Sequence, residues 1–587
     1  MEGNLVTRYS SRPSAPWSWL IIVVLITGLC LLTTAAQRRQ APTYDEQNHV
    51  TRGIAILRTG DYRLSLHHPP LANILEALPV AWLHNDGFTT QMPAWRTCAI
   101  WPAARTTIWS HGAEGIHLIM LARLPVLVFV IVLAVIIFLW SRELFGYWGG
   151  VLSLLLLALD PNVLAHGGLV TTDIPAASTI LLAMYCLRWY LKDPRWTRCI
   201  ITGGVLGIAM ATKFSGLVML PISMAVVILA FCWPRYGGLG GVNHWVTPRC
   251  HRLRHAAGSL CMLWICAGIV IWGCYGFTVE PLGQKPGQPL SATATVIDRI
   301  PIPALQYFRG LKRISLDKQQ RSMSFLGCTS RKGTAFWGYT PVVMITKTPL
   351  PELLVVLGIL TLSCISHTRW LFRIPAYELW ILLLPICIYI LFAQMGSSLL
   401  QGIRHLLPLY PLLFILSGGW VRIIQAYPRA IVAFVLLFAF QGILLYRAYP
   451  DYLSYFNELA GGPQNGYRLA AGPNCDWGQD VERLARWQQQ HHIPHLGFSY
   501  YGTTPPEVYG LHYTPLWGCG LMHRRGVKPN LATFQGYIAV SVTNLVNDPS
   551  LCGVDYRPLE HSVPYARVGN TIKVYKLPES VHRLHTR

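Results

Sequence analysis

Long apolar runs recur along the chain and predict helices that cross a lipid bilayer. Eleven runs approach or exceed the length that a hydrocarbon layer of roughly 30 Å requires. The third and fifth runs are short, so each is either re-entrant or misplaced at its ends. The pattern predicts a mainly α, polytopic membrane protein with about 11 transmembrane helices. The runs lie at 17–35, 117–140, 147–160, 173–190, 199–212, 216–233, 257–277, 350–366, 376–394, 403–421 and 429–447.

The first run ends in TTAAQRRQ, which resembles a signal-peptidase site. Because ten more apolar runs follow, we expect the first helix to remain uncleaved and to serve as a span.

The basic residues of the short connections lie mostly on one side of the predicted spans. Cytoplasmic loops are enriched in Lys and Arg, whereas long loops are translocated regardless of their charge. With a cytoplasmic N-terminus, the short outer connections hold only Lys213 and Arg404. This orientation places the long loops 36–116 and 278–346, and everything after Tyr449, outside. The inner loops hold thirteen basic residues: Arg142, Arg188, Lys192, Arg195, Arg198, Arg235, Arg249, Arg252, Arg254, Arg369, Arg373, Arg422 and Arg429.

The pattern changes after Tyr449 and becomes polar and rich in turn residues. Alternation in Tyr537–Leu545 and Thr571–Leu577 predicts strands, and Gln479–Gln490 has the spacing of a helix. We therefore expect a transmembrane domain over residues 1–449 and a small outer α/β C-terminal domain over residues 450–587.

Composition narrows the class of protein. Hydrophobic residues make up 52% of the 587, charged residues make up 13%, and the mean hydropathy is +0.37, which excludes an ordinary soluble protein. The net charge of +22 resides in short loops rather than in one basic patch, so we expect the lipid bilayer as a partner and no nucleic acid.

Most of the fifteen cysteines lie in apolar runs, whereas Cys475, Cys519 and Cys552 lie in the polar tail, where one disulfide is compatible with the sequence.

The most informative stretch, YDEQNHVTRGIAILRTGDYRLSLHHPPL, follows the first span and begins at Tyr44. Its first part predicts a short helix that Asp45 caps and Gly60 ends. The sequence His68-Pro69-Pro70 opens a second, apolar helix with proline in its first turn. We predict two helices at the membrane interface, with Asp45 and Glu46 at the mouth.

Other polar groups interrupt the apolar background on the same predicted side. An ionisable group at membrane depth costs roughly 2.5–3.5 kcal/mol, so each needs an explanation. Asp173 opens the fourth span, where capping and function are compatible. Lys213 either reaches lipid head groups or binds phosphate. Arg404 and His405 open the tenth span from the same side.

Carboxylates and cations at one membrane face suit a transfer reaction. Asp45 is the candidate base for an acceptor hydroxyl, and Lys213 and Arg404 are candidate partners of a departing phosphate. A divalent metal held by His49, His67 or His68 with a carboxylate is the other possibility, although interfacial histidines are often only polar anchors.

At these residues the chain resembles the GT-C membrane glycosyltransferases of family 39, which include protein O-mannosyltransferases and bacterial aminoarabinose transferases. The matching features are the acidic pair Asp45-Glu46, a nearby His49, and HPPL at His68–Leu71. Segments that look like uncharacterised bacterial members are ATKFSG around Lys213, KTPLP from Lys347, GIRHLLPLYP around Arg404, and DYLSYFNELAGGPQNGYR with DWGQD after Asp451.

The resemblance implies a polyprenyl-phosphate-linked sugar donor, transfer to a hydroxyl with inversion, and an acidic base in the first outer loop. That base is Asp45 here, and Glu46 beside it is the second candidate catalytic residue. Asp173 would be the second acidic residue, which assists metal or substrate binding, and His68 would join the substrate site. The chain departs from the eukaryotic enzymes because His49 follows Asp45 by four residues rather than three and because their β-trefoil insert is not apparent. The sugar therefore stays open, as does the acceptor, whether glycan, lipid or protein.

Two further features bear on the function. The basic loop Gly283–Lys347 either covers the donor phosphate or attracts head groups through Arg309, Lys312, Arg313, Arg321, Arg331 and Lys332. A transporter or flippase of lipid-linked sugars is the alternative function, but it would place polar residues at the bilayer midplane. Because the predicted spans are nearly free of charge at their centres, we favour the enzyme.

Overall fold

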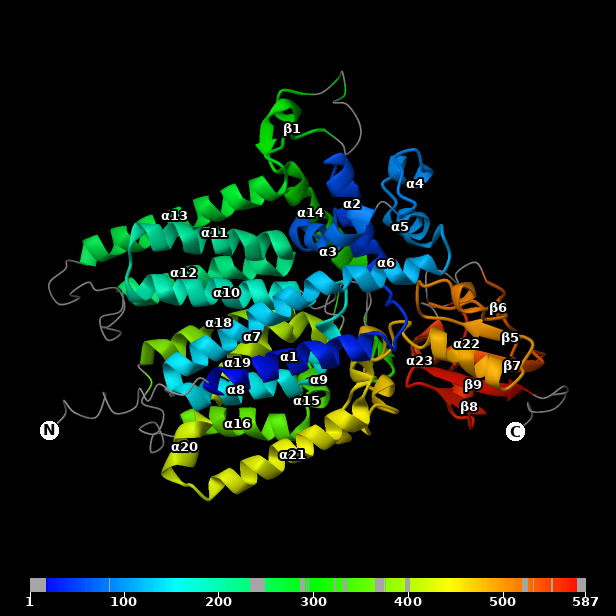
Figure 1. Ribbon diagram of the computed structural model, residues 1–587. Coiled ribbons are helices and arrows are strands. Elements are labelled where there is room, and N and C mark those ends of the chain that lie inside the picture. The colour runs from blue at the N-terminus through cyan, green and yellow to red at the C-terminus, as the bar shows by residue number, and fades with distance from the viewer. Residues whose placement is uncertain are drawn as a thin grey trace.

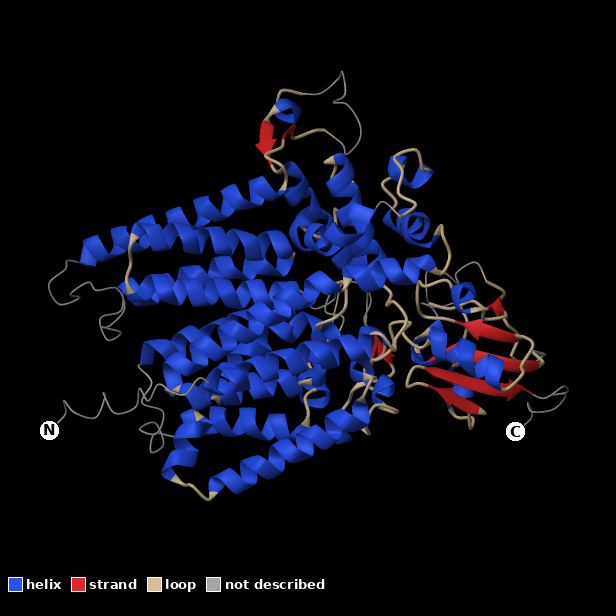
Figure 2. Ribbon diagram, in the orientation of Figure 1, coloured by secondary structure: helices blue, strands red, loops and turns tan. Residues whose placement is uncertain are grey.

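A long helical bundle with a small β-sheet at one end makes up the molecule (Figure 1, Figure 2). The computed structural model describes residues 17–577, except for residues 84, 233–248, 285–290, 292, 294, 321–323, 331–333, 335, 365–373, 375, 396–401, 520–525, 532 and 550–552. The sheet and the helices that follow the first span lie at the same end of the bundle (Figure 1).

Each of the eleven predicted apolar runs is helical in the structure. Within the described residues, eight helical segments are long and apolar enough to cross a membrane, and a bent pair makes a ninth. The helices are α1 (Trp17–Gln37), α6 (Glu114–Ala122) with α7 (Leu124–Phe145), α8 (Tyr147–Leu159), α10 (Asp173–Lys192), α11 (Trp196–Thr212), η2 (Phe214–Val218) with α12 (Met219–Cys232), α13 (Arg249–Cys274), α16 (Leu350–Cys364), α18 (Ala376–Met395), η7 (Ile403–Leu409) with α19 (Tyr410–Ser417) and α20 (Trp420–Ala426), and α21 (Ala430–Ala448).

The runs predicted as short are indeed short helices, α8 with 13 residues and α11 with 17. A feature that was not predicted is the bend of 119° between α15 (Tyr339–Lys347) and α16. Pro349 and Pro351 flank this break, and proline lacks the N–H that a continuous helix needs. Because of this bend, α15, which ends the second long loop, does not continue in the direction of α16.

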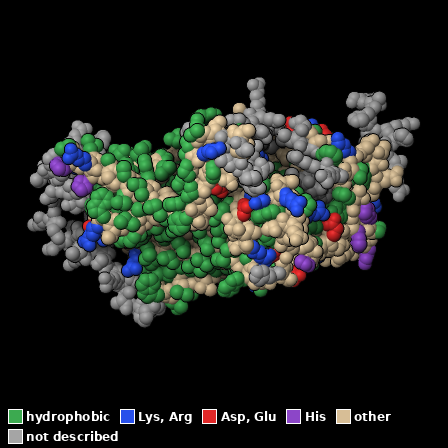
Figure 3. Space-filling model, turned by 90° about the horizontal axis from the view of Figure 1, so that it is seen from above, with side chains coloured by type: hydrophobic (Ala, Val, Ile, Leu, Met, Phe, Trp, Pro, Cys, Tyr) green, Lys and Arg blue, Asp and Glu red, His purple; other side chains and the backbone are tan. Residues whose placement is uncertain are grey.

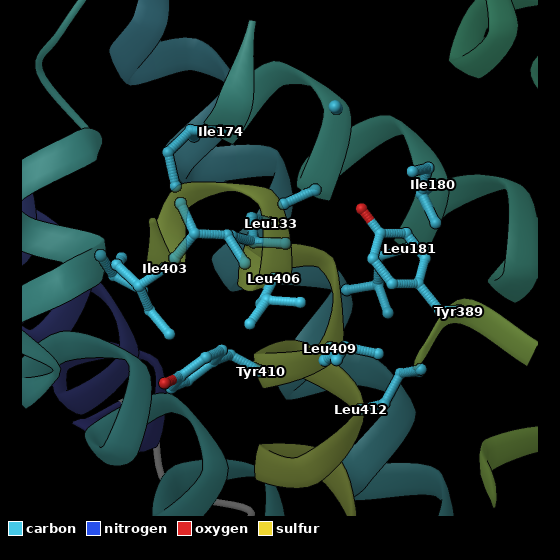
Figure 4. Close-up of a cluster of buried hydrophobic side chains, with 14 of the residues drawn as sticks. Leu133, Ile174, Ile180, Leu181, Tyr389, Ile403, Leu406, Leu409, Tyr410 and Leu412 are labelled. Carbon is cyan, nitrogen blue, oxygen red and sulfur yellow. The ribbon is translucent and has the colours of Figure 1, made fainter. Parts of the chain in front are cut away.

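Hydrophobic side chains hold the bundle together and cover much of its surface. Figure 4 shows residues of α7, α10, α18, η7 and α19 that converge on one buried cluster, among them Leu133, Leu181, Tyr389, Leu406 and Tyr410. On the face seen in Figure 3, hydrophobic side chains cover the middle of the bundle, basic side chains lie toward both ends, and most acidic ones lie toward the end that carries the sheet. This distribution is the one expected for a protein that sits in a bilayer.

The stretch after the first span folds into the two predicted helices, α2 (Glu46–Thr59) and α3 (Pro70–Leu83). Gly60 ends α2 in the left-handed conformation, with φ of 67°, and its N–H donates to the Ile56 carbonyl at 2.8 Å. A Cβ at Gly53 would lie 2.0 Å from the Asn73 carbonyl oxygen, so only glycine allows α2 and α3 to approach this closely.

The remaining elements are short. The first long loop continues through α4 (Pro93–Arg96) and α5 (Ile100–Trp109), and α9 (Pro161–His166) precedes α10. In the second long loop, β1 (Val279–Pro281) pairs with β2 (Pro301–Pro303), and α14 (Leu305–Gln320) is followed by the hairpin of β3 (Ser324–Phe325) and β4 (Cys328–Thr329).

The C-terminal region contains a five-stranded mixed sheet in the order β6-β5-β7-β9-β8. β5 (Leu496–Ser499) is parallel to β6 (Tyr513–Pro515) and β7 (Gly536–Ser541), while β9 (Ile572–Leu577) is antiparallel to β7 and β8 (Ala566–Val568). The predicted helix is α22 (Val481–Gln490), which packs on the sheet through Val481, Leu484 and Ala485.

The structure corrects one predicted strand of the C-terminal region and describes two of its three cysteines. The strand predicted over Tyr537–Leu545 ends at Ser541, where α23 (Val542–Val546) begins. Other short helices among the described residues are η4 (Ile297–Arg299), η8 (Tyr452–Ser454), η9 (Glu458–Ala460), η10 (Gly466–Arg468), η11 (Gly472–Asn474), η12 (Pro506–Tyr509) and α25 (Arg557–Glu560). Cys475 is a buried free thiol, Cys519 is disulfide-bonded, and Cys552 lies outside the described residues.

Candidate active site

Two acidic and two basic side chains from distant parts of the chain meet at one end of the bundle. Arg404 Nη1 lies 3.3 Å from Asp45 Oδ2 and 3.6 Å from Asp173 Oδ2. Lys213 Nζ lies 2.5 Å from Asp173 Oδ1. Asp173 is almost fully buried, with 1% of its side chain exposed, whereas 26% of the Asp45 side chain is exposed. Of the two carboxylates, Asp45 is the one that an incoming molecule can reach.

Asp45 occupies the N-cap position of α2, but its side chain makes no capping hydrogen bond. The C-terminal region fixes the backbone before it, because Ala41 N–H donates to the Gln479 carbonyl and Tyr44 N–H donates to the Trp477 carbonyl, both at 3.0 Å. In return, the Thr503 hydroxyl donates to the Tyr44 carbonyl at 2.8 Å. These bonds hold the Asp45 carboxylate toward Arg404.

Arg404 lies in the 3₁₀ helix η7, half-buried over the indole of Trp477, with 4.5 Å between its guanidinium carbon and the ring centre. Asn474 helps to place η7, because its Oδ1 accepts the Ile403 N–H at 3.0 Å. The polar C-terminal region therefore supplies part of the site, a role that the sequence pattern did not reveal.

Asp173 is the first residue of α10, and the N-cap position before it is held by Thr172, whose side chain makes no capping hydrogen bond. The N-cap role considered for Asp173 is therefore wrong, and its carboxylate instead pairs with Lys213 and Arg404. His405 is half-buried beside Arg404, and its carbonyl accepts the Tyr389 hydroxyl at 2.8 Å.

Glu46 points away from this group and is fully buried against Arg123. The two side chains form paired hydrogen bonds, Nε to Oε1 at 2.8 Å and Nη2 to Oε2 at 2.7 Å. Thr43 N–H and Val170 N–H also donate to this carboxylate, at 2.6 and 3.0 Å. Burial alone would raise the pKa of Glu46, but Arg123 and these N–H groups hold it below its ordinary value.

The candidate metal ligands are divided between two places. His49 and His68 lie together, with ring centres 4.8 Å apart, and His49 Nδ1 bonds Asn73 Oδ1 at 2.7 Å. His67 instead pairs with Asp317 of α14, with 3.1 Å between Nε2 and Oδ2. Among the residues with described positions, no group of three or more His, Cys, Asp or Glu side chains is arranged to hold a metal ion. The three histidines considered as metal ligands therefore do not come together at one place.

Two of the six basic residues of the second long loop pair with acidic residues of the same loop. Arg309 pairs with Glu280 at 2.7 Å, and Arg313 lies 3.4 Å from Asp317. Lys312 lies on α14 between them, whereas Arg321, Arg331 and Lys332 lie outside the described residues.

Lys347 is a buried cation whose importance the sequence alone did not indicate. Its ammonium donates to the carbonyls of Leu453 at 2.9 Å and Asn474 at 2.7 Å, and lies 4.7 Å from the ring centre of Phe456. Lys347 thus ties the bend between α15 and α16 to the segment that positions Arg404.

The buried histidines predict a dependence of stability on pH. Burial, together with the positive charge of Arg52, lowers the pKa of His49 to about 4. The unfolded chain then takes up this proton before the folded chain does, so stability is lost as the pH falls from about 6.5 toward 4. We expect the free energy of unfolding to fall by about 2 kcal/mol from this histidine between pH 7 and pH 5.

Thermal unfolding in detergent at the two pH values checks this expectation. The substitution His49→Gln should flatten the dependence, whereas His111→Gln, at an exposed position, should leave it unchanged. An unchanged slope in the His49 variant would contradict the assignment.

Part of the chain is similar to a known protein family. Residues 117–236, which include Asp173 and Lys213, match the family model described as dolichyl-phosphate-mannose-protein mannosyltransferase. This match covers about a fifth of the chain. The search of the curated proteins found no match to this sequence.

The comparison with solved structures gave matches at low sequence identity. ArnT from Cupriavidus metallidurans bound to undecaprenyl phosphate has a TM-score of 0.46 and 13% identity, over 95% of this chain and 98% of that one. The Saccharomyces cerevisiae protein O-mannosyltransferase Pmt1–Pmt2 complex bound to the sugar donor has a TM-score of 0.32 and 16% identity, over 45% and 34%. AglB from Archaeoglobus fulgidus, in complex with an inhibitory peptide and a dolichol-phosphate, has a TM-score of 0.43 and 11% identity, over 90% and 69%.

Proposed function

We propose that this protein is a glycosyltransferase that moves a sugar from a polyprenyl-phosphate-linked donor to an acceptor hydroxyl, with inversion, and that Asp45 is the general base. The observation that carries the proposal is the partly exposed Asp45 carboxylate 3.3 Å from Arg404, in one cluster with Lys213. The matched family is named for a phosphate-linked sugar donor, which supports the donor class.

The reaction follows from the chemistry of these groups. Asp45 takes the proton of the acceptor hydroxyl, and the oxygen attacks the anomeric carbon from the face opposite the phosphate. The bond between that carbon and the phosphate oxygen breaks, and the electron pair leaves with the polyprenyl phosphate. Arg404 and Lys213 stabilise the charge that grows on the phosphate. Asp173 holds both cations in place, and His68 and His405 lie around the substrate.

Glu46 acts in this proposal as a positioning residue rather than a reacting group, because its carboxylate oxygens are already occupied by Arg123, Thr43 and Val170.

The same proposal places the site at the outer face of the plasma membrane, with a cytoplasmic N-terminus and an outer C-terminal region. The excess of Lys and Arg in the opposite loops supports this orientation. The acceptor is a glycan, lipid or protein.

The test of the function starts from the purified chain in lipid vesicles with a polyprenyl-phosphate-linked sugar. Mass spectrometry of glycans, lipids and proteins from cells with and without the chain supplies the acceptor. We expect polyprenyl phosphate to appear in step with glycosylated acceptor. Movement of intact lipid-linked sugar between leaflets, without cleavage, would instead support a transporter.

A prediction about the donor concerns Lys213. The substitution Lys213→Ala removes one of the two cations near the phosphate and should raise the apparent KM for the lipid-linked donor about tenfold, with a smaller effect on the acceptor KM. Lys192→Ala, which changes a lysine at the other end of α10, is the matched control. An unchanged donor KM in the Lys213 variant would remove Lys213 from donor binding.

A further inference from the structure

A small cavity of about 240 Å³ opens between the end of α1 and the junction of α6 with α7. Arg123 forms part of its wall, but the Arg123 guanidinium is already occupied by Glu46 and by the Gln37 carbonyl at 2.9 Å. Neither Asp45 nor Arg404 lines it. The cavity is thus separate from the candidate active site. Its other lining residues include Gln37, Arg38, His117, Leu121, Leu124 and Leu127.

One end of the cavity is polar. Arg38 and His117 are exposed, and no described residue forms an ion pair or side-chain hydrogen bond with either of them. Gln37 is 3% exposed, and its Nε2 donates to the Ala165 carbonyl at 2.7 Å. Gln37 Oε1 is buried without a hydrogen-bond partner among the described residues. The accessible charged and polar side chains at this end of the cavity are therefore those of Arg38 and His117.

The other end of the cavity is apolar and continues onto the surface that faces lipid. Leu124, which lines the cavity, is 50% exposed. On neighbouring turns, Val128 of α7 is 59% exposed and Leu31 of α1 is 65% exposed. A ligand in the cavity would therefore have a polar head beside Arg38 and His117 and an apolar part along α1 and α7.

We propose that this cavity binds the head group of an anionic glycerophospholipid such as phosphatidylglycerol. Its phosphate pairs with Arg38 and His117, and the acyl chains lie along Leu124. The volume is below the roughly 300–1,000 Å³ of sites for drug-sized ligands, so it suits a head group rather than a whole lipid-linked sugar. Positive charge at the mouth distinguishes this ligand from a neutral lipid.

Native mass spectrometry of the full chain, released from bilayers of equal phosphatidylglycerol and phosphatidylcholine, tests the proposal. The wild-type chain should retain phosphatidylglycerol in preference to phosphatidylcholine. Arg38→Gln should weaken that preference about fivefold, the effect expected from one cationic side chain at a membrane surface. Arg39→Gln is the matched control, because the Arg39 guanidinium lies over the Tyr449 ring at 5.5 Å and does not line the cavity.

A second pair of variants tests the cavity without changing its charge. Leu124→Trp fills the apolar end and should displace the lipid, whereas Val128→Trp, one turn along α7 on the exposed face, should not. Equal retention of the two lipids by the wild-type chain would overturn the proposal. So would equal losses in the Arg38 and Arg39 variants, or full retention in the Leu124 variant, because either result would place the lipid elsewhere.

Discussion

Replacing Asp45 by Asn is expected to lower the rate of sugar transfer by about 10²–10⁴-fold, because the amide cannot take the proton of the acceptor hydroxyl. The substitution keeps the size of the side chain and removes one charge from a partly exposed pair with Arg404. We therefore expect little change in membrane insertion or thermal stability. The measurement is the initial rate of glycosylated acceptor formation at saturating donor.

Asp61→Asn is the matched control, because Asp61 belongs to the same long loop and pairs with Arg63 rather than with the cluster. This control should retain full activity. Undiminished turnover by the Asp45 variant would show that Asp45 is not the base, whereas loss in both variants would point to the charge of the loop instead.

The second large effect concerns stability. Replacing Glu46 by Ala leaves Arg123 as a buried charge without its carboxylate, and breaking such a pair typically costs about 3–5 kcal/mol. The Thr43 and Val170 N–H groups would lose their acceptor at the same time. We expect a large fall in thermal unfolding temperature in detergent, with activity lost as the chain unfolds.

The double variant Glu46→Gln with Arg123→Met distinguishes a paired charge from a catalytic carboxylate. It removes both charges and should recover much of the stability, together with sugar transfer if Glu46 only positions its neighbours. Glu482→Gln, which changes a carboxylate paired with Arg486 on α22, should alter stability by less than about 0.5 kcal/mol. Recovered stability without recovered transfer would assign Glu46 a direct part in the reaction.

Much of the fold could be predicted from the apolar pattern, since a bilayer requires long apolar helices and these leave a strong signal. The two interfacial helices were also predictable, because Gly60 and Pro70 mark their ends through local backbone geometry. The bend at Pro349 and the end of β7 at Ser541 were harder to predict, because tertiary contacts decide where a helix turns or a strand stops.

The site was predictable in its residue types but not in its pairings. Asp45 and Glu46 are neighbours, and successive residues at the start of a helix point about 100° apart. The sequence alone cannot say that one faces Arg404 while the other faces Arg123. The contribution of Trp477 was hidden for a similar reason, because its partner is 73 residues away along the chain, at Arg404.

The anomeric configuration of the transferred sugar tests the central claim most directly. A donor of known configuration is reacted with the purified chain, the product is characterised by NMR, and the protein is checked by mass spectrometry for a covalently attached sugar. If Asp45 acts as a base in a single displacement, the product has the opposite configuration and no sugar is found on the protein. Retention of configuration, or a sugar attached to Asp45, would contradict the account.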